Sequence, residues 1–434
     1  MAVHFGTDGI RGRADDEITP AVAYRLGVAV ARVFGAQPVI IGYDTRASSP
    51  ALAAAAAAGA SDAGAPVTNL GVVTTPGVAV VCEERRSVGI VVSASHNPYY
   101  DNGLKVLGVG GGKLDYPTEQ ALEAALAAVE DGPENFESLP IDDTAIAQYI
   151  DRLVAAVPAG SLNGLRIVLD CANGAASDIA PAVFRRLGAD VDVLSASPDG
   201  TNINLNCGST HPERLQERVR HSGADLGLAF DGDADRLVAV DDHGVVRDGD
   251  DLMVLFALDR HDRGVLGGAL VVTSMSNLGL RRAMRNARIS VIETDVGDRN
   301  VLLALEENGL FFGGEQSGHL IFRDLEPTGD GTLSGLLLCE LVARTGRLSQ
   351  LADDAWRRLP QQLLNVPAEN FDTAVVDEVF AQHLDTFGVA GDDVRLLVRP
   401  SGTEPVVRIM VEASDGSFVD AFIDAVAARL TPRG

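Results

Sequence analysis

Short apolar runs alternate with helix-like segments along most of the chain, and the same order recurs three times. Each unit has a β-branched run, a helix-like stretch, a second run, and a third run that ends in a polar loop. Buried strands of parallel sheets are continuous apolar runs, so this order predicts βαβ units and mainly parallel sheets. The predicted strands are residues 39–43, 66–70 and 88–92, then 166–170, 191–194 and 226–230, then 270–273, 290–293 and 310–312.

A helix is predicted between the first two strands of each unit, at residues 50–60, 180–187 and 280–286. Near residue 360 the pattern changes to two strands, 395–398 and 406–412, followed by an amphipathic helix, 418–430. We therefore predict an α/β protein. It has three similar α/β domains with mixed, mainly parallel sheets, and a smaller C-terminal α+β domain. The predicted domains are residues 1–145, 146–250, 251–360 and 361–434.

Ligands of such sheets bind beyond the carboxyl ends of the strands, so the polar loops after the third strands are the candidate sites. In the second of these loops, Asp231, Asp233 and Asp235 alternate with other residues. Three carboxylates would repel one another without a cation, but together they can hold one hard cation. An EF-hand is excluded, because its sixth and twelfth positions would be Arg236 and Asp242 instead of Gly and Glu. Three protein ligands leave room for a phosphate oxygen, which suits one Mg²⁺ per chain; a solvated acidic turn is the alternative.

The loop at residues 93–98 can present a serine hydroxyl above the edge of the first sheet, although a helix cap or a turn is an alternative. Lys105 follows this loop and is one of only two lysines in the chain, the other being Lys113. A lysine, unlike an arginine, can shift its pKa and transfer protons.

The third loop offers Glu315, Ser317 and His319 at alternate positions, which suits binding of sugar hydroxyls and proton transfer. A fourth loop, between the two C-terminal strands, has Arg399 and Arg408 around a flexible glycine and two hydroxyls, and it can hold a phosphate. Glycine-rich turns are the alternative for both loops. An anionic substrate needs local cations on so acidic a chain, and the candidates are Arg11, Lys105, Arg236, Arg399 and Arg408.

Composition limits the possible partners. The chain has 434 residues and a net charge of −26, so we expect no nucleic-acid partner. It has no apolar run of the ~18 residues that a membrane helix needs and no secretion signal, so we expect a cytoplasmic monomer or homodimer without membrane contacts.

The acid excess has two open explanations, a halophilic origin or codon bias that replaces Lys with Arg. The four cysteines are far apart in the sequence, so we expect them to be structural.

Together, these loops resemble the signatures of the α-D-phosphohexomutase superfamily, in order and over essentially the whole chain. The matching segments are Phe5-Gly-Thr-Asp-Gly-Ile-Arg-Gly12, Ser93-Ala-Ser-His-Asn-Pro98, and residues 231–236, 314–319 and 399–405. The resemblance implies four domains around a central cleft, each contributing one loop. Ala234 departs from the pattern, because glycine is frequent at that position.

The resemblance also implies a role for each residue. Ser95 carries a phosphoryl group as phosphoserine, and Mg²⁺ lies between that phosphate and the three carboxylates. The residues implied in substrate binding are Arg236, Glu315 and Ser317 for the sugar, and Arg399, Ser401, Gly402, Thr403 and Arg408 for the phosphate. Lys105, His319 and Arg11 are candidates for proton transfer or charge stabilisation, and Arg299 is a further candidate phosphate contact.

Within the superfamily, the sequence is most similar to the branch that isomerises glucosamine phosphates. The supporting segments are residues 100–105, 201–204, 207–211, 314–319 and 401–405. This branch implies interconversion of glucosamine 6-phosphate and glucosamine 1-phosphate through glucosamine 1,6-bisphosphate or a similar compound. Three alternatives stay open: the phosphomannomutase/phosphoglucomutase branch, a metal-dependent sugar phosphatase, and a cation-binding protein without enzymatic activity.

Overall fold

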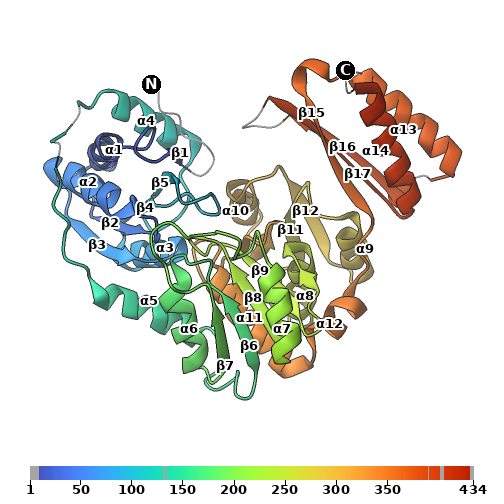
Figure 1. Cartoon of the computed structure of the whole chain (residues 1–434), viewed down its shortest axis with the longest axis horizontal. Helices are drawn as coiled ribbons and strands as arrows, with labels where there is room; N and C mark the ends of the chain where they lie inside the picture. Colours follow the sequence, from blue (N-terminus) through green and yellow to red (C-terminus); the bar gives the residue numbers. More distant parts are fainter. Residues whose placement is uncertain (1–8, 131, 134, 390, 401–404, 431–434) are drawn as a thin grey trace. The chain divides into compact units, whose positions relative to one another are not determined.

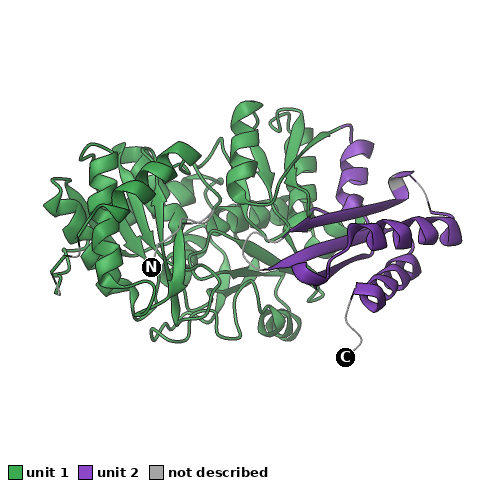
Figure 2. Ribbon diagram, turned by 90° about the horizontal axis from the view of Figure 1, so that it is seen from above, with its two compact units in different colours: residues 1–275, 289–354 green, residues 276–288, 355–434 purple. Residues whose placement is uncertain are grey.

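The computed structural model describes residues 9–130, 132–133, 135–389, 391–400 and 405–430 (Figure 1). The described residues form two compact units, those within 1–275 and 289–354 and those within 276–288 and 355–434 (Figure 2). The first unit contains three sheets and the second contains one. The prediction of an α/β protein with three mixed sheets and a smaller C-terminal module is confirmed.

The first sheet has the strand order β1-β5-β4-β2-β3. Strand β2 pairs in parallel with β3 and β4, and the other pairs are antiparallel. Its strands are β1 (Ile10–Arg13), β2 (Val39–Tyr43), β3 (Val67–Val72), β4 (Val88–Val92) and β5 (Asp101–Leu107). The helices of this part are α1 (Pro20–Val33), α2 (Ser49–Asp62), α3 (Thr75–Arg85) and α4 (Tyr116–Ala127).

The second sheet repeats this order as β10-β9-β8-β6-β7, and the third repeats it without the first edge strand, as β14-β13-β11-β12. The second comprises β6 (Arg166–Asp170), β7 (Asp190–Leu194), β8 (Leu226–Phe230), β9 (Leu237–Asp241) and β10 (Val246–Arg247), with α5 (Asp143–Ala155), α6 (Ala176–Arg186) and α7 (Glu213–Ser222). The third comprises β11 (Ala269–Thr273), β12 (Ser290–Thr294), β13 (Phe312–Gly314) and β14 (Leu320–Phe322). Its helices are α8 (Gly249–Asp262), α10 (Asp298–Glu307), α11 (Gly331–Thr345) and α12 (Leu348–Ala355).

Each third strand is followed by a polar loop and then by an antiparallel strand, as β4–β5, β8–β9 and β13–β14. The sequence did not predict these antiparallel strands. All three begin within a few residues of the polar loops, and the last one, β14, is only three residues long. The strand predicted at 310–312 lies two residues further along, at β13.

The second unit has a three-stranded antiparallel sheet in the order β15-β17-β16. It comprises β15 (Gln361–Pro367), β16 (Val394–Pro400), β17 (Val406–Ala413), α13 (Thr373–Phe387) and α14 (Gly416–Leu430). Helix α9 (Leu278–Asn286) belongs to the same unit, and its Leu278 N–H donates to the Glu412 carboxylate (3.0 Å).

Two expectations from composition can be compared with these residues. All four cysteines are buried and outside any disulfide, as predicted. Among the described residues, no helix combines the length and the apolar character that crossing a membrane requires.

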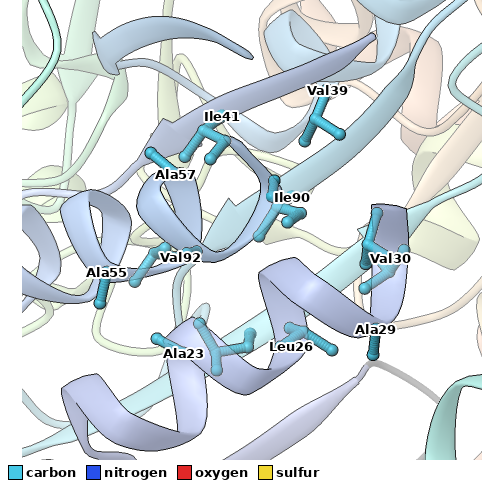
Figure 3. Close-up of a cluster of buried hydrophobic side chains, with 14 of the residues drawn as sticks. Ala23, Leu26, Ala29, Val30, Val39, Ile41, Ala55, Ala57, Ile90 and Val92 are labelled. Carbon is cyan, nitrogen blue, oxygen red and sulfur yellow. The ribbon is translucent and has the colours of Figure 1, made fainter. Parts of the chain in front are cut away.

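Helices α1 and α2 cross at two glycines, beside the core that Figure 3 shows. A Cβ atom on Gly27 would lie 2.0 Å from the Ala56 carbonyl oxygen, and one on Gly59 would lie 2.0 Å from that of Tyr24. No side chain fits at such distances, so the two backbones pack directly against each other. This contact holds α2 over the sheet, and the loop before α2 belongs to the candidate site.

We predict that Gly59→Ala destabilises the protein by ~1–3 kcal/mol, the usual cost of overpacking. Alanine is the better helix former by about 1 kcal/mol, so helix propensity alone would make Gly59→Ala more stable than the wild type. Close packing predicts the opposite sign. The measurement is the midpoint of urea unfolding. Gly416→Ala is the control, because its Cβ would meet only Pro360 at an ordinary 3.5 Å. A Gly59→Ala protein as stable as the control would contradict the close packing.

Candidate active site

Ser95 lies in the loop between β4 and β5, where the chain reverses beyond the carboxyl end of β4. It is 1% exposed and has a φ of +51°, a left-handed conformation that costs a non-glycine residue roughly 1–2 kcal/mol. Its hydroxyl donates to Asp231 Oδ2 at 2.5 Å and lies 3.3 Å from His96 Nδ1. The predicted serine loop (residues 93–98) and the predicted metal loop (residues 231–236) therefore meet.

A buried arginine that the sequence did not predict holds the serine loop in this shape. Arg46 is 1% exposed, and its Nε donates to Asp44 Oδ2 (2.8 Å). Its other nitrogens donate to the carbonyl oxygens of Ser95 (2.9 Å), Asn97 (2.9 Å), Asp101 (3.0 Å) and Pro98. A single guanidinium group thus organises the backbone on both sides of Ser95.

The metal loop brings its three carboxylates together in the interior. Ligand atoms of Asp231, Asp233 and Asp235 lie within 4.8 Å of one another, and all three residues are buried. Burial and the two neighbouring carboxylates raise the pKa of Asp231 to about 7. Asp233 Oδ1 has no hydrogen-bond partner among the described residues. Crowded, buried acceptors of this kind fit a divalent cation.

Cations offset part of this negative charge. Lys105 Nζ lies 2.7 Å from Asp233 Oδ2 and 3.4 Å from Asp235 Oδ2. His319 Nδ1 lies 3.8 Å from Asp235 Oδ1. Burial opposes protonation of His319, but the Asp235 and Asp298 carboxylates outweigh it and raise its pKa to about 9. Lys105 and His319, both candidates for proton transfer, thus contact the carboxylate cluster.

The metal loop also rests on the first domain through Thr75, the first residue of α3. The Thr75 hydroxyl donates to Asp233 Oδ2 (2.5 Å), and its N–H donates to the Asp233 carbonyl oxygen (3.0 Å). Behind it, Thr74 donates to the Tyr149 hydroxyl (3.1 Å), and Tyr149 donates to Asp330 (2.6 Å).

Within the metal loop, Ala234 has a φ of +56°, which explains why glycine suits this position.

The third polar loop, residues 313–319, is called the sugar loop below, and it adjoins the metal loop. The Leu237 N–H, just after the metal loop, donates to the Gly318 carbonyl oxygen (3.0 Å). Glu315 Oε1 accepts from the Gly297 N–H (3.0 Å), and burial raises the pKa of Glu315. Ser317 is exposed. Three of the four predicted loops are therefore neighbours in the first unit.

Two predicted cations lie beside the serine loop. Arg236 Nη1 lies 3.3 Å from His96 Nδ1, and Arg11 lies in β1 opposite Gly103 of β5. Burial lowers the pKa of His96 to about 4, and the charges of Arg236 and Arg11 add to the effect. Local positive potential next to Ser95 suits a phosphate group, and the roles of both arginines stay predictions.

The two strands that flank the fourth loop, β16 and β17, lie in the second unit. Arg399 and Arg408 are opposite each other in the β16–β17 pair and therefore share one face of the sheet. Two like charges side by side suit an anion. Ser401, Gly402 and Thr403, predicted to complete this site, lie outside the described residues. Arg299, the further candidate, is in the first unit and pairs with Glu119.

Comparison with known proteins identifies the family. Four models match the chain in order: phosphoglucomutase/phosphomannomutase alpha/beta/alpha domain I at residues 2–132, domain II at 147–244, domain III at 248–359 and the C-terminal domain at 363–429. The chain belongs to the phosphoglucomutase/phosphomannomutase family. The domain boundaries predicted from the sequence stay a prediction.

Similar members of the phosphoglucomutase/phosphomannomutase family come from several bacteria. A phosphoglucosamine mutase of Moorella thermoacetica is 46% identical, with 96% of each chain covered. One of Desulforudis audaxviator is 44% identical, with 99% of this chain and 98% of the relative covered. Among solved structures, a phosphoglucomutase/phosphomannomutase family protein of Burkholderia thailandensis is 27% identical, with a TM-score of 0.82 and 99% and 98% coverage.

We predict that Arg46→Lys lowers the free energy of unfolding by ~3–5 kcal/mol, because an ammonium cannot reach all these carbonyls and its charge stays buried. Urea unfolding measures the change. Arg218→Lys is the control, because the Arg218–Asp192 pair is exposed and such pairs contribute at most about 1 kcal/mol. Equal losses in the two variants would contradict the role given to Arg46.

We predict that Mg²⁺ stabilises the wild-type protein by ~2.7 kcal/mol at one hundred times its dissociation constant. Thermal unfolding with MgCl₂, against KCl at equal ionic strength, measures the effect. Asp233→Asn should lose it, whereas Asp192→Asn, at the exposed pair, should keep it. An equal Mg²⁺-dependent shift in Asp233→Asn would place the ion elsewhere.

Proposed function

We propose that the chain is a phosphoglucosamine mutase that interconverts glucosamine 6-phosphate and glucosamine 1-phosphate. The observation that carries this proposal is the buried Ser95 hydroxyl 2.5 Å from Asp231, inside a cluster of three carboxylates. The relatives named phosphoglucosamine mutase, at 44–46% identity over nearly the full chain, support the choice of sugar.

The substrate is held at both ends in this mechanism. Arg399 and Arg408, with the loop that joins their strands, bind the phosphate that does not react. Glu315 and Ser317 bind sugar hydroxyls, and the buried Glu315 carboxylate already accepts from a backbone N–H, which fixes its orientation. Arg11 and Arg236 attract the phosphate that reacts at Ser95.

Ser95 carries the phosphoryl group as phosphoserine. In the first transfer, the bond from phosphorus to Ser95 Oγ breaks, and a bond to the free sugar hydroxyl forms. The hydroxyl loses its proton, and the product is glucosamine 1,6-bisphosphate. This intermediate turns over in the site and returns its other phosphate to Ser95, so glucosamine 1-phosphate leaves.

Asp231, Asp233 and Asp235, together with the phosphorylated Ser95, would hold Mg²⁺. The ion would neutralise charge that develops on the phosphoryl oxygens during transfer. Lys105 stabilises charge at the same place, because its ammonium contacts two of the carboxylates. Lys105, His319 and Arg11 are the candidates for proton transfer or charge stabilisation.

We predict that, with Mg²⁺ and a catalytic amount of hexose 1,6-bisphosphate, glucosamine 6-phosphate is a better substrate than mannose 6-phosphate or glucose 1-phosphate. Ser95→Ala should lose at least about 10³-fold in kcat, because the nucleophile is absent. Ser222→Ala, on the exposed surface of α7, should keep full activity. A coupled assay measures the rates with the three substrates and the kcat of the two variants. Mass spectrometry of the wild-type protein should find phosphate on Ser95.

Two results would contradict this assignment. If glucosamine 6-phosphate were the poorest of the three substrates, the chain would belong to the phosphomannomutase/phosphoglucomutase branch. If free phosphate appeared in step with substrate loss, the chain would be a sugar phosphatase.

The acid excess yields one further prediction. If the protein is adapted to a high-salt cytoplasm, KCl at molar concentration should stabilise it, because salt screens the repulsion within a chain of charge −26. Unfolding midpoints at 0.1 M and 2 M KCl measure the effect, with sucrose at equal osmolality as the control. Full stability at low salt would instead favour codon bias as the cause.

A further inference from the structure

Two ion pairs with opposite orientation join the first domain to the start of α10. Lys113 Nζ lies 2.7 Å from Asp298 Oδ2. Arg299 Nη1 donates to Glu119 Oε2 (2.9 Å), and its Nη2 contacts Glu119 Oε1. Each side thus supplies one cation and one carboxylate, and we call these four residues the reciprocal clasp.

The reciprocal clasp is largely removed from solvent. The side chains of Lys113 and Asp298 are 13% and 9% exposed, and those of Arg299 and Glu119 are 16% and 10% exposed. Ion pairs at this burial depend on geometry far more than surface pairs do, because the loss of one partner leaves the other charge poorly solvated.

Helix stability accounts for the two carboxylates, because Glu119 and Asp298 lie in the first turns of α4 and α10, but it does not account for the two cations. Arg299 lies in the first turn of α10, where the helix dipole disfavours a cation. Lys113 is one of only two lysines in the chain, and the other, Lys105, contacts the metal loop. The compact Lys113 ammonium contacts Asp298 Oδ2, whereas an arginine fork suits both oxygens of a carboxylate.

The same segment of chain contacts the sugar loop. Asp298 Oδ2, which binds Lys113, lies 3.6 Å from His319 Nε2. One residue earlier, the Gly297 N–H donates to Glu315 Oε1 (3.0 Å). Residues 297–299 therefore touch the sugar loop on one side and the first domain, which carries Ser95, on the other.

We propose that the reciprocal clasp positions the sugar loop relative to the domain that carries Ser95, with Glu119 and Arg299 as positioning residues. The proposal rests on the proposed function, because it assigns the sugar loop to the hexose. Loss of either pair should weaken hexose-phosphate binding more than phosphoryl transfer, since the clasp contacts sugar-loop residues and none of its four residues contacts Ser95 among the described contacts.

A charge swap tests this proposal. In each of Glu119→Arg and Arg299→Glu, KM for glucosamine 6-phosphate should rise by about 10-fold, a change within the range of interaction energies between contacting residues. The value of kcat should fall by less than ~3-fold. The double variant, Glu119→Arg with Arg299→Glu, should recover most of the lost affinity. A double variant no better than the single variants would overturn the proposal.

A second readout does not depend on catalysis. Hydrogen–deuterium exchange of peptides that cover residues 312–322 should be faster in both single variants and should return to the wild-type rate in the double variant. Peptides of β6 and β8 serve as the control and should not change. Unchanged exchange of residues 312–322 in both single variants would also overturn the proposal. Failure of the proposed function would appear separately, as a wild-type protein that lacks mutase activity.

If the charge reversals prevent folding, Glu119→Gln and Arg299→Gln replace them, because they remove one charge each and keep most of the side-chain volume. The same rise in KM and the same faster exchange are expected in each of these variants, and unchanged KM or unchanged exchange of residues 312–322 in both would overturn the proposal.

Discussion

The structure depends on a concentration of negative charge in its interior. Asp231, Asp233 and Asp235 crowd into one buried loop, and burial makes their mutual repulsion stronger than it would be in water. Lys105 and His319 contact two of these residues, and Ser95 donates to the third. The reactive hydroxyl is thereby held at the place where a divalent cation would offset the remaining charge.

This arrangement follows from one topological unit that is used three times. In each sheet of the first unit, the third strand turns into an antiparallel fourth strand, and the turn carries the polar residues. The loop ends are fixed by strand pairing, so a few contacts suffice to join the turns. The Thr75 hydroxyl donates to the Asp233 carboxylate, and the Gly318 carbonyl oxygen accepts from the Leu237 N–H. The backbone of the first turn is held by Arg46.

Much of this could be predicted from the sequence. Apolar runs located the parallel strands, and the position of polar residues after those strands located Ser95, the three aspartates and His319. Motif resemblance then added the roles. The loops were predictable because their chemistry is local: residues two apart in one loop already define a ligand set.

The supporting residues could not be predicted in the same way, because their partners are distant in the sequence. Arg46 contacts residues about fifty positions away, and Arg299 contacts Glu119 across 180 positions. The periodicity of apolar residues along the sequence does not indicate contacts between residues so far apart. Arg46 did have a signal, since it follows the strand at residues 39–43 in a polar loop, but within the three α/β units the predicted sites came from the loops after the third strands. Thr75 likewise follows a predicted strand and precedes a proline.

The most direct test of the account is to locate a metal ion. Crystals soaked in MnCl₂ should show one strong anomalous peak in this loop, within ~2.5 Å of carboxylate oxygens from Asp231, Asp233 and Asp235. The phosphate of a phosphorylated Ser95 should lie next to that peak. An empty loop in fully soaked crystals, with Lys105 and His319 as its counter-charges, would contradict the account.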